Sequence, residues 1–354
     1  MAKKRIAILV ILLVIAVLFG VCTIFSGCYI LRQGVTMIGY LCQAVPLENA
    51  ADEDFVRLVE EIRLFARDYL GLSVNREFTR YVTLDRDFLA AVVSASAKDS
   101  FQRHYWRFPV VGRLPYKGFF NVEGARRERE RLERRDLDVL VRPVDAFSTL
   151  GWFNDPLYSF MRYYSPWRLA DLMIHELLHA TVFIRGQIQF NEELAQFVGK
   201  EGSRLFMERR FGLDSEEYRQ MLASQADSRN FVGFIQELIA ELEELYASGI
   251  GREKILIERE RIIGAAKDRF YIEYDNLFTT DNFRGFLDMP INNAYLDLFR
   301  LYHTPDHFFE LLFERSGSDL PAFIAAAKTV TRRGGNLRVQ LANALVLCNI
   351  RLME

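Results

Sequence analysis

The sequence is poor in histidine and cysteine and carries almost no net charge. Its 354 residues include five His and four Cys, and the formal net charge at pH 7 is −2. So few cysteines do not make a disulfide scaffold, and a charge near zero gives no sign of nucleic-acid binding. Internal repeats and low-complexity linkers are also absent from the sequence. What remains is the composition of a globular protein, 50% apolar and 26% charged.

Two of the five histidines fall in one pentapeptide, His175-Glu-Leu-Leu-His179. The surrounding run from Leu169 to Thr181 has apolar residues at helical spacing, and residues four apart on a helix share a face. Two imidazoles on one face can bind one metal ion, with Glu176 beside it as a general base. The pattern predicts a zinc-dependent hydrolase, most simply a peptidase. The alternatives are a buried helix that happens to carry two His, or a structural metal site.

A catalytic zinc needs a third protein ligand and an open fourth position. Asn191 is predicted to cap a second helix that continues through the apolar spacing of 193–211. The segment between the two helices, 181–190, is rich in β-branched and aromatic residues and predicts a short strand-like return. Glu192 at the helix entry would then face the histidines, and Glu193 is the reserve. The alternative is that both acids only interact favourably with the helix dipole.

Several segments resemble the predicted aminopeptidase family of bacterial zinc metallopeptidases. They are Gly112–Phe120, Ala146–Pro156, His175–Thr181 and Asn191–Ala195, with weaker similarity through Asn292–Tyr295. The resemblance implies a gluzincin-like site with His175, His179 and Glu192 on zinc and Glu176 as the base. It also implies a peptide substrate. The family's activity is itself inferred largely from this motif, so it supports a metallopeptidase more strongly than an aminopeptidase.

Two departures from better-characterised gluzincin aminopeptidases concern specificity. Those enzymes carry a Gly-x-Met-Glu-Asn segment whose acid binds the free amine of the substrate, and this sequence has none. The twelve residues between His179 and Glu192 are also a shorter interval than in those enzymes. Exopeptidase and endopeptidase activity therefore both remain open, whereas the metal site itself is unaffected.

The predicted mechanism uses water on zinc. A zinc ion held by three protein ligands lowers the pKa of a bound water toward about 7. Glu176 takes the proton as the water attacks a peptide carbonyl and later gives it to the leaving amine. A hydroxyl donor to the oxyanion usually completes such a site, and Tyr295 and Tyr302 are candidates by position alone. The alternative for both is an ordinary core tyrosine.

Two further segments have competing interpretations. In related metallopeptidase architectures, the segment that follows a strand and precedes the metal helix is an edge strand that pairs with substrate. The residues at that place here are Ser148, Thr149, Leu150 and Gly151; the alternative is a turn whose aromatic neighbours fill the core. His303 and His307 are also four apart, but Thr304-Pro305 between them is typical of a helix start, which makes them helix-entry residues.

The N-terminus indicates a membrane tether. Lys3-Lys4-Arg5 precedes an uncharged run over 6–25, which as a helix is long enough to span a bilayer core. The basic flank favours a cytoplasmic start and an exported domain in a bacterial cell envelope. Phe25-Ser-Gly-Cys28 resembles a lipobox, so lipidation at Cys28 is expected; the alternative is that Cys28 ends a transmembrane helix. Cys42 and Cys348 either form a disulfide or are buried thiols.

We therefore expect a signal peptide or anchor over residues 1–27 and a zinc metallopeptidase domain over 28–354. The fold class is α+β and helix-rich, zincin-like, with a small sheet, the HExxH helix and a long α-hairpin. Predicted helices cover 55–70, 123–135, 214–245, 252–274 and 304–312. A strand is predicted over 137–147, a strand and then a helix over 82–97, and a strand or a helix over 337–352.

Two rival functions remain. One is a non-catalytic envelope protein that binds a partner through a metal-stabilised fold. The other is a tethered zinc hydrolase of a non-peptide substrate. The intact Glu176 argues against the first, because a structural metal site does not need a base.

Overall fold

A computed structural model describes residues 29–49, 52–108, 112–145, 156–302, 308–331, 333 and 335–352. The N-terminal part forms α2 (Tyr29–Gln43), β1 (Val45–Pro46), η1 (Leu47–Asn49), α3 (Glu53–Asp68), β2 (Arg80–Val82), β3 (Ala90–Ala97), β4 (Trp106–Phe108), β5 (Gly112–Leu114), β6 (Lys117–Phe119), α4 (Val122–Glu133) and β7 (Leu137–Val144). The rest forms β8 (Leu157–Tyr158), η2 (Ser159–Tyr163), α5 (Pro166–Thr181), α6 (Ile188–Phe211), α7 (Glu216–Ala247), α8 (Arg252–Leu277), η3 (Arg284–Phe286), α9 (Asn293–Tyr302), α10 (Phe308–Arg315), α11 (Leu320–Ala327) and α12 (Leu337–Leu352).

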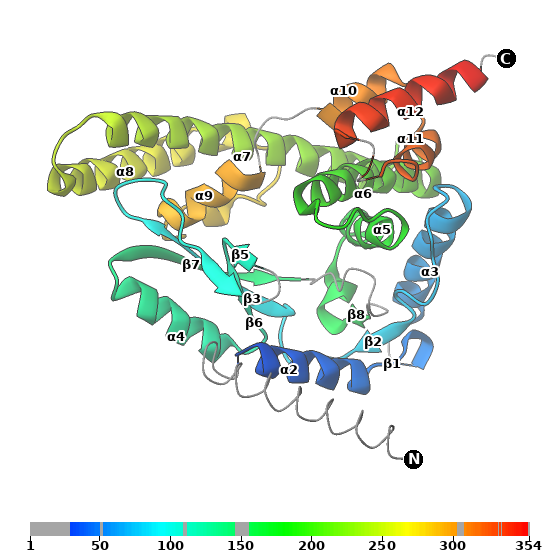
Figure 1. The fold of residues 1–354 in the computed structure, drawn as a ribbon, viewed down its shortest axis with the longest axis horizontal. Helices are drawn as coiled ribbons and strands as arrows, with labels where there is room; N and C mark the ends of the chain where they lie inside the picture. The colour runs from blue at the N-terminus through cyan, green and yellow to red at the C-terminus, as the bar shows by residue number, and fades with distance from the viewer. Residues whose placement is uncertain are drawn as a thin grey trace.

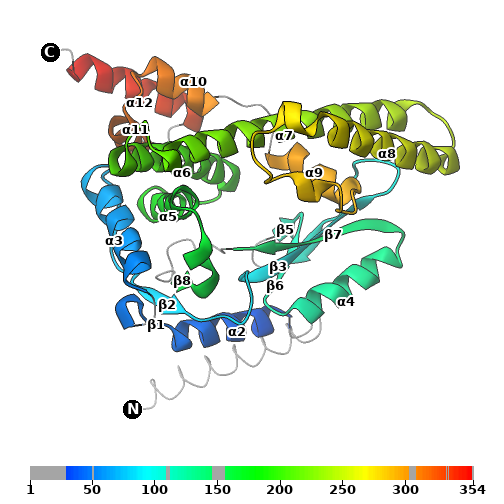
Figure 2. The same cartoon turned by 180° about the vertical axis from the view of Figure 1, so that it is seen from behind.

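Helices dominate the described part of the chain, and the strands form three small sheets with the orders β1-β2-β8, β6-β3-β7 and β4-β5. Figures 1 and 2 show the sheet β6-β3-β7 between α4 on one side and the α7–α8 hairpin with α9 on the other. Beside this layered half, α5 and α6 pack together with α3, and α10, α11 and α12 cover the far edge. The helix-rich α+β class is confirmed.

The strand β3 is the centre of its sheet and is buried along almost its whole length. It pairs antiparallel with β7 from Ala90 opposite Val144 to Ala97 opposite Leu137. Because α4 contacts one face and α9 the other, its small Ala, Ser and Val side chains do not alternate with polar ones. Such continuous burial conceals the period of two that identifies a strand. The helix predicted for the second half of 82–97 is wrong for this reason.

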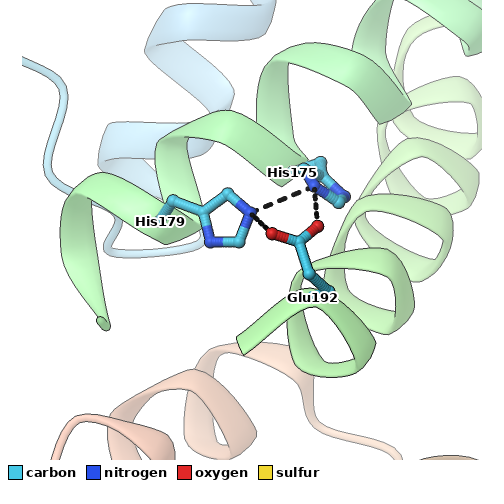
Figure 3. Close-up of side chains that lie close together, drawn as sticks. All are labelled: His175, His179 and Glu192. Atoms are coloured by element: carbon cyan, nitrogen blue, oxygen red, sulfur yellow. Dashed lines mark hydrogen bonds and ion pairs between the residues drawn. The ribbon is translucent and has the colours of Figure 1, made fainter. Parts of the chain in front are cut away.

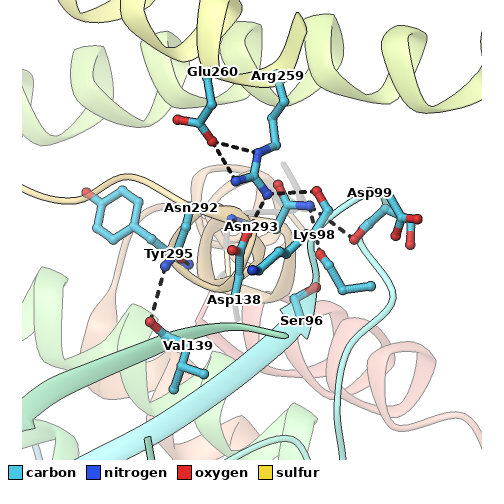
Figure 4. Close-up of polar contacts among 12 residues, drawn as sticks. Ser96, Lys98, Asp99, Asp138, Val139, Arg259, Glu260, Asn292, Asn293 and Tyr295 are labelled. Carbon is cyan, nitrogen blue, oxygen red and sulfur yellow. Dashed lines mark hydrogen bonds and ion pairs between the residues drawn. The ribbon is translucent and has the colours of Figure 1, made fainter. Parts of the chain in front are cut away.

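A buried polar network joins the hairpin to the sheet (Figure 4). Arg259 of α8 donates to Asp138 of β7 with a Nη1–Oδ2 distance of 2.9 Å, and the backbone N–H of Asn293 donates to the same oxygen at 2.9 Å. The Asn293 amide donates to Ala97 O at 2.9 Å and accepts from the Tyr246 hydroxyl at 2.7 Å. Burial raises the pKa of Asp138, against the opposing effects of Asn293 and Arg259. These bonds fix α8 and α9 to the edge of the sheet.

Most helices agree with the sequence predictions. The charged helix and the long hairpin appear as α4, α7 and α8, and the open choice over 337–352 is decided in favour of a helix, α12. The strand predicted over 137–147 appears as β7. The strand-like return over 181–190 is wrong, because the chain makes a short turn there and α6 already begins at Ile188.

Some predictions concern residues outside the described ranges. These are the anchor over 1–27, lipidation at Cys28, the substrate strand at 148–151, and His303 with His307. Within the described residues, none of the helices combines the length and apolar character needed to cross a bilayer. Cys42 is a free, exposed thiol, so both alternatives predicted for it, a disulfide and a buried thiol, are wrong.

Candidate metal centre

The helix α5 carries His175 and His179, and its apolar face determines the direction in which they point. Ser165 stands at the cap position and Pro166 occupies the first turn, a favourable start for a helix. Leu169, Met173 and Leu177 are completely buried. Burial of each of these side chains stabilises the folded state by about 1.5–3 kcal/mol. With that face fixed against the core, His175 and His179 must lie on the side that meets α6.

The helix α6 begins one turn earlier than the sequence predicts. Its cap position is Gln187, and Asn191 already lies inside the helix. The buried amide of Asn191 accepts from Ile184 N at 3.0 Å and donates to Ile184 O at 2.9 Å. Asn191 is therefore not the N-cap; its side chain closes the turn between α5 and α6. These two hydrogen bonds fix the rotation of α6 about its axis, so that Glu192 faces α5.

The ligand atoms of His175, His179 and Glu192 converge between the two helices (Figure 3). The two Nε2 atoms are 3.1 Å apart, and the carboxylate oxygens of Glu192 lie 3.6 Å from His175 Nε2 and 3.5 Å from His179 Nε2. In a tetrahedral zinc site with bonds of about 2.1 Å, neighbouring ligand atoms are about 3.4 Å apart. The donor types and their spacing therefore fit a zinc ion.

The two candidate acids have different surroundings. Glu193 accepts from Arg338 of α12 at 2.8 Å and from Gln189 at 2.9 Å, so it links α6 to α12. Glu192 is the acid that meets the histidines. The choice between adjacent acids depends on Arg338, which lies far along the chain, and the local sequence contains no sign of it.

The metal-free cluster is electrostatically coupled. Hydrogen bonds from His175 and His179 hold the pKa of Glu192 at about 2. Burial alone would lower the pKa of His175, but its hydrogen bond to Glu192 and the nearby charges of Glu176 and Glu192 raise it. A metal ion competes with protons for these same lone pairs. Zinc binding at this site is therefore expected to release protons and to weaken as the pH falls.

A close approach of α5 and α6 supports the centre. A Cβ at Gly199 of α6 would lie 2.5 Å from Asp171 Oδ1 and 3.2 Å from the Cβ of His175, so only glycine fits. Asp171 lies one turn before His175, and burial raises its pKa to about 6 against the charges of His175 and Lys200. Neither Gly199 nor Asp171 is among the site residues predicted from the sequence. The spacing of Asp171, four residues before the candidate ligand His175 on the same helix, was the signal that could have identified it.

The structure does not bring every predicted residue to the cluster. Tyr295 is buried near Phe286 and Phe299, in the core of the α7–α8 hairpin, with ring-centroid distances of 6.4 Å and 5.4 Å. Burial raises the pKa of its hydroxyl. Its role as an oxyanion donor stays a prediction, as does that of Tyr302, which ends α9.

Comparison with known proteins identifies a family. The model of a family described as "Putative aminopeptidase" matches residues 36–341, a span that includes α5, α6 and all three residues of the candidate metal centre. No curated protein and no solved structure matches. Because the match covers most of the chain, the protein belongs to this aminopeptidase family.

Proposed function

We propose that the protein is a zinc-dependent peptidase in which His175, His179 and Glu192 hold the metal. The observation that supports this most strongly is the convergence of three ligand atoms, two imidazole and one carboxylate, at distances that match a tetrahedral zinc site. Three protein ligands leave the fourth position for water or substrate, which distinguishes a catalytic from a closed structural site.

The residues of the chain have separate roles in this proposal. Zinc, when bound, lowers the pKa of water toward about 7 and stabilises negative charge on a carbonyl oxygen. Glu176 stands between the two histidines on α5, where its carboxylate can accept the proton of the attacking water. It then donates that proton to the leaving amine. His175, His179 and Glu192 position the metal and take no proton during the reaction.

Family membership supports a peptide substrate. The kind of peptide cleavage that we propose is aminopeptidase activity. The missing Gly-x-Met-Glu-Asn segment leaves recognition of the free amine to other residues. The products distinguish the two modes of cleavage. An aminopeptidase releases single residues in order from the N-terminus, whereas an endopeptidase yields internal fragments.

We also propose that the domain is exported and held at a membrane of the bacterial envelope. The uncharged run over 6–25 with its basic flank supports this tether. In a lipoprotein, processing removes residues 1–27 and acylates Cys28; in a transmembrane anchor, both steps are absent. The intact mass of the mature protein distinguishes the two routes.

The test of the proposed function is metal content together with turnover of a mixed peptide library, with the products read by mass spectrometry. We expect about one zinc per chain, as one three-ligand site requires, and cleavage that a chelator abolishes and added zinc restores. Full zinc occupancy without cleavage of any peptide would contradict a peptidase. That result would favour the binding protein or a hydrolase of another substrate.

A further inference from the structure

The helix α2 has an outward face of unusual composition. Its 15 residues include one charged residue, Arg32. Val35 and Ile38 have 69% and 57% of their surface exposed, and Cys42 is exposed as well. At 100° per residue these three positions fall on one side of the helix. The helix therefore presents an outer stripe of Val35, Ile38 and Cys42 to solvent, without a charged residue among them.

No described side chain covers this stripe closely. A Cβ placed on Gly34 or Gly39 would meet no heavy atom within 4 Å. Figures 1 and 2 show α2 along one edge of the molecule, with α6 and α10 to α12 at the opposite edge. The exposed positions of α4 at the same edge are mostly Arg and Glu, which is the usual composition of a solvated helix face. The outer stripe of α2 is therefore not explained by ordinary solvent exposure.

The opposite side of α2 is fixed to the domain. The Tyr29 hydroxyl donates to Gly118 O, and the side chain of Gln33 accepts from Phe120 N at 2.8 Å. Farther along the helix, Arg86 donates to the Tyr40 hydroxyl at 2.6 Å. Tyr29, Gln33 and Tyr40 share the face opposite the outer stripe. Because three bonds hold that face, α2 cannot rotate to bury its apolar side without breaking them.

We propose that the outer stripe of α2 lies in the interface of the membrane that holds the tether. The occupant is a lipid surface because of where the apolar run over 6–25 ends. Only Ser26, Gly27 and Cys28 separate that run from Tyr29, and three residues span at most about 11 Å. A lipid on Cys28 would bring α2 closer still. Under either route α2 starts at the lipid surface, and this inference rests on the proposed tether.

In this proposal the outer stripe orients the domain on the membrane, and the tether attaches it. A short helix with few apolar side chains binds a bilayer weakly by itself, but a tether a few residues away makes the contact intramolecular and raises its effective concentration. With α2 on the lipid, the α6 edge of the molecule points away from the membrane (Figure 1). The metal centre between α5 and α6 then receives its substrate from the aqueous side.

The test uses the full chain reconstituted in phosphatidylcholine vesicles that contain nitroxide-labelled lipid. Cys22, Cys28 and Cys348 are replaced by Ser, so that an environment-sensitive fluorophore reacts with Cys42 alone. The control carries the same fluorophore at Ile272→Cys with Cys42→Ser. Ile272 is also apolar and is 76% exposed, but it lies on α8, away from the α2 edge. We expect blue-shifted and quenched emission from position 42 and neither change at position 272.

A second variant, Val35→Asp with Ile38→Asp, should lose the quenching at Cys42 while the protein still floats with the vesicles and still cleaves peptides. Flotation with equal, weak quenching at both positions would overturn the role of α2 and leave the tether standing. A Cys42 probe shielded from aqueous iodide but not quenched by lipid would show that protein covers the stripe, which also overturns the proposal. Because Cys28→Ser prevents lipidation and processing, the apolar run over 6–25 is the anchor in this sample. Failure to float would overturn anchoring by that run and this inference together, and zinc-dependent peptide cleavage measured on the same sample reports separately on the metal centre.

Discussion

Two polar clusters join secondary-structure elements of this protein, one buried and one partly open to solvent, and their polar groups are satisfied in different ways. In the network of Asp138, Arg259 and Asn293, each acceptor meets a donor within the chain, and the positive charge of Arg259 meets the negative charge of Asp138. The cluster of His175, His179 and Glu192 contains no permanent cation. Within the described residues, His179 Nδ1 is buried and makes no hydrogen bond.

The difference between the clusters indicates a structural role for the Asp138 network and a functional role for the histidine cluster. A buried polar group without a partner costs about 1–3 kcal/mol, and such exceptions in native proteins call for a specific explanation. The Asp138 network has no such exception and serves to fix the hairpin to the sheet. In the histidine cluster the Nε2 atoms and the Glu192 carboxylate are the groups that a divalent cation would bind in place of protons. A cation bound there would not supply the partner that His179 Nδ1 lacks. Changes in the two clusters should therefore affect different properties.

The largest expected effect is on catalysis without an effect on metal or fold. Glu176→Gln keeps the size of the side chain but cannot accept the proton of water, so turnover of a cleaved peptide should fall about 10²–10⁴-fold. Zinc content and melting temperature should remain those of the parent protein. Turnover equal to that of the parent would remove Glu176 from the mechanism.

Removing a charge from the Asp138 network should lower stability and leave zinc binding and catalysis unchanged. Arg259→Leu leaves the buried Asp138 without its cation and should lower the free energy of unfolding by about 3–5 kcal/mol. Chemical denaturation measures this loss, and folded protein should retain zinc and peptide cleavage. The control is the double variant with Asp138→Leu, which removes both charges and should recover part of the loss. Loss of zinc from folded Arg259→Leu protein would show that the two clusters are coupled.

A smaller effect is expected at the contact that supports the metal helix. Gly199→Ala places a methyl group against Asp171 and the Cβ of His175, so α5 and α6 must separate slightly. Changes to residues that support metal ligands typically cost 10–100-fold in metal affinity, and a competition titration with a zinc chelator measures this. The matched control is Gly233→Ala on α7, where a Cβ would meet nothing within 4 Å. Equal zinc affinity in both variants would dismiss the supporting role of Gly199.

The sequence was most informative where the chemistry is local. The spacing of His175 and His179 on an apolar helix predicts their shared face, and the two long charged segments over 214–245 and 252–274 predict the hairpin of α7 and α8. Residues brought together over long distances were harder to predict. The roles of Glu193 and Asn191 depend on Arg338 and on the turn at Ile184, and neither contact has a local signature.

Burial on both sides also limited the sequence analysis. The strand β3 is covered by helices on each face, so its apolar run lacks the alternation that distinguishes a strand from a helix. The outer stripe of α2 was missed for a different reason. Its apolar residues resemble an ordinary helix face until the structure shows that this face is the exposed one.

The central claim, that Glu192 completes a zinc site with the two histidines, is tested most directly by zinc content in a matched pair of variants. Glu192→Gln and Glu193→Gln change adjacent acids of α6 in the same way, but only the first removes a carboxylate from the cluster. Elemental analysis of the two folded proteins should show zinc largely lost from Glu192→Gln and about one zinc per chain retained in Glu193→Gln. Full occupancy in Glu192→Gln with loss in Glu193→Gln would contradict the account.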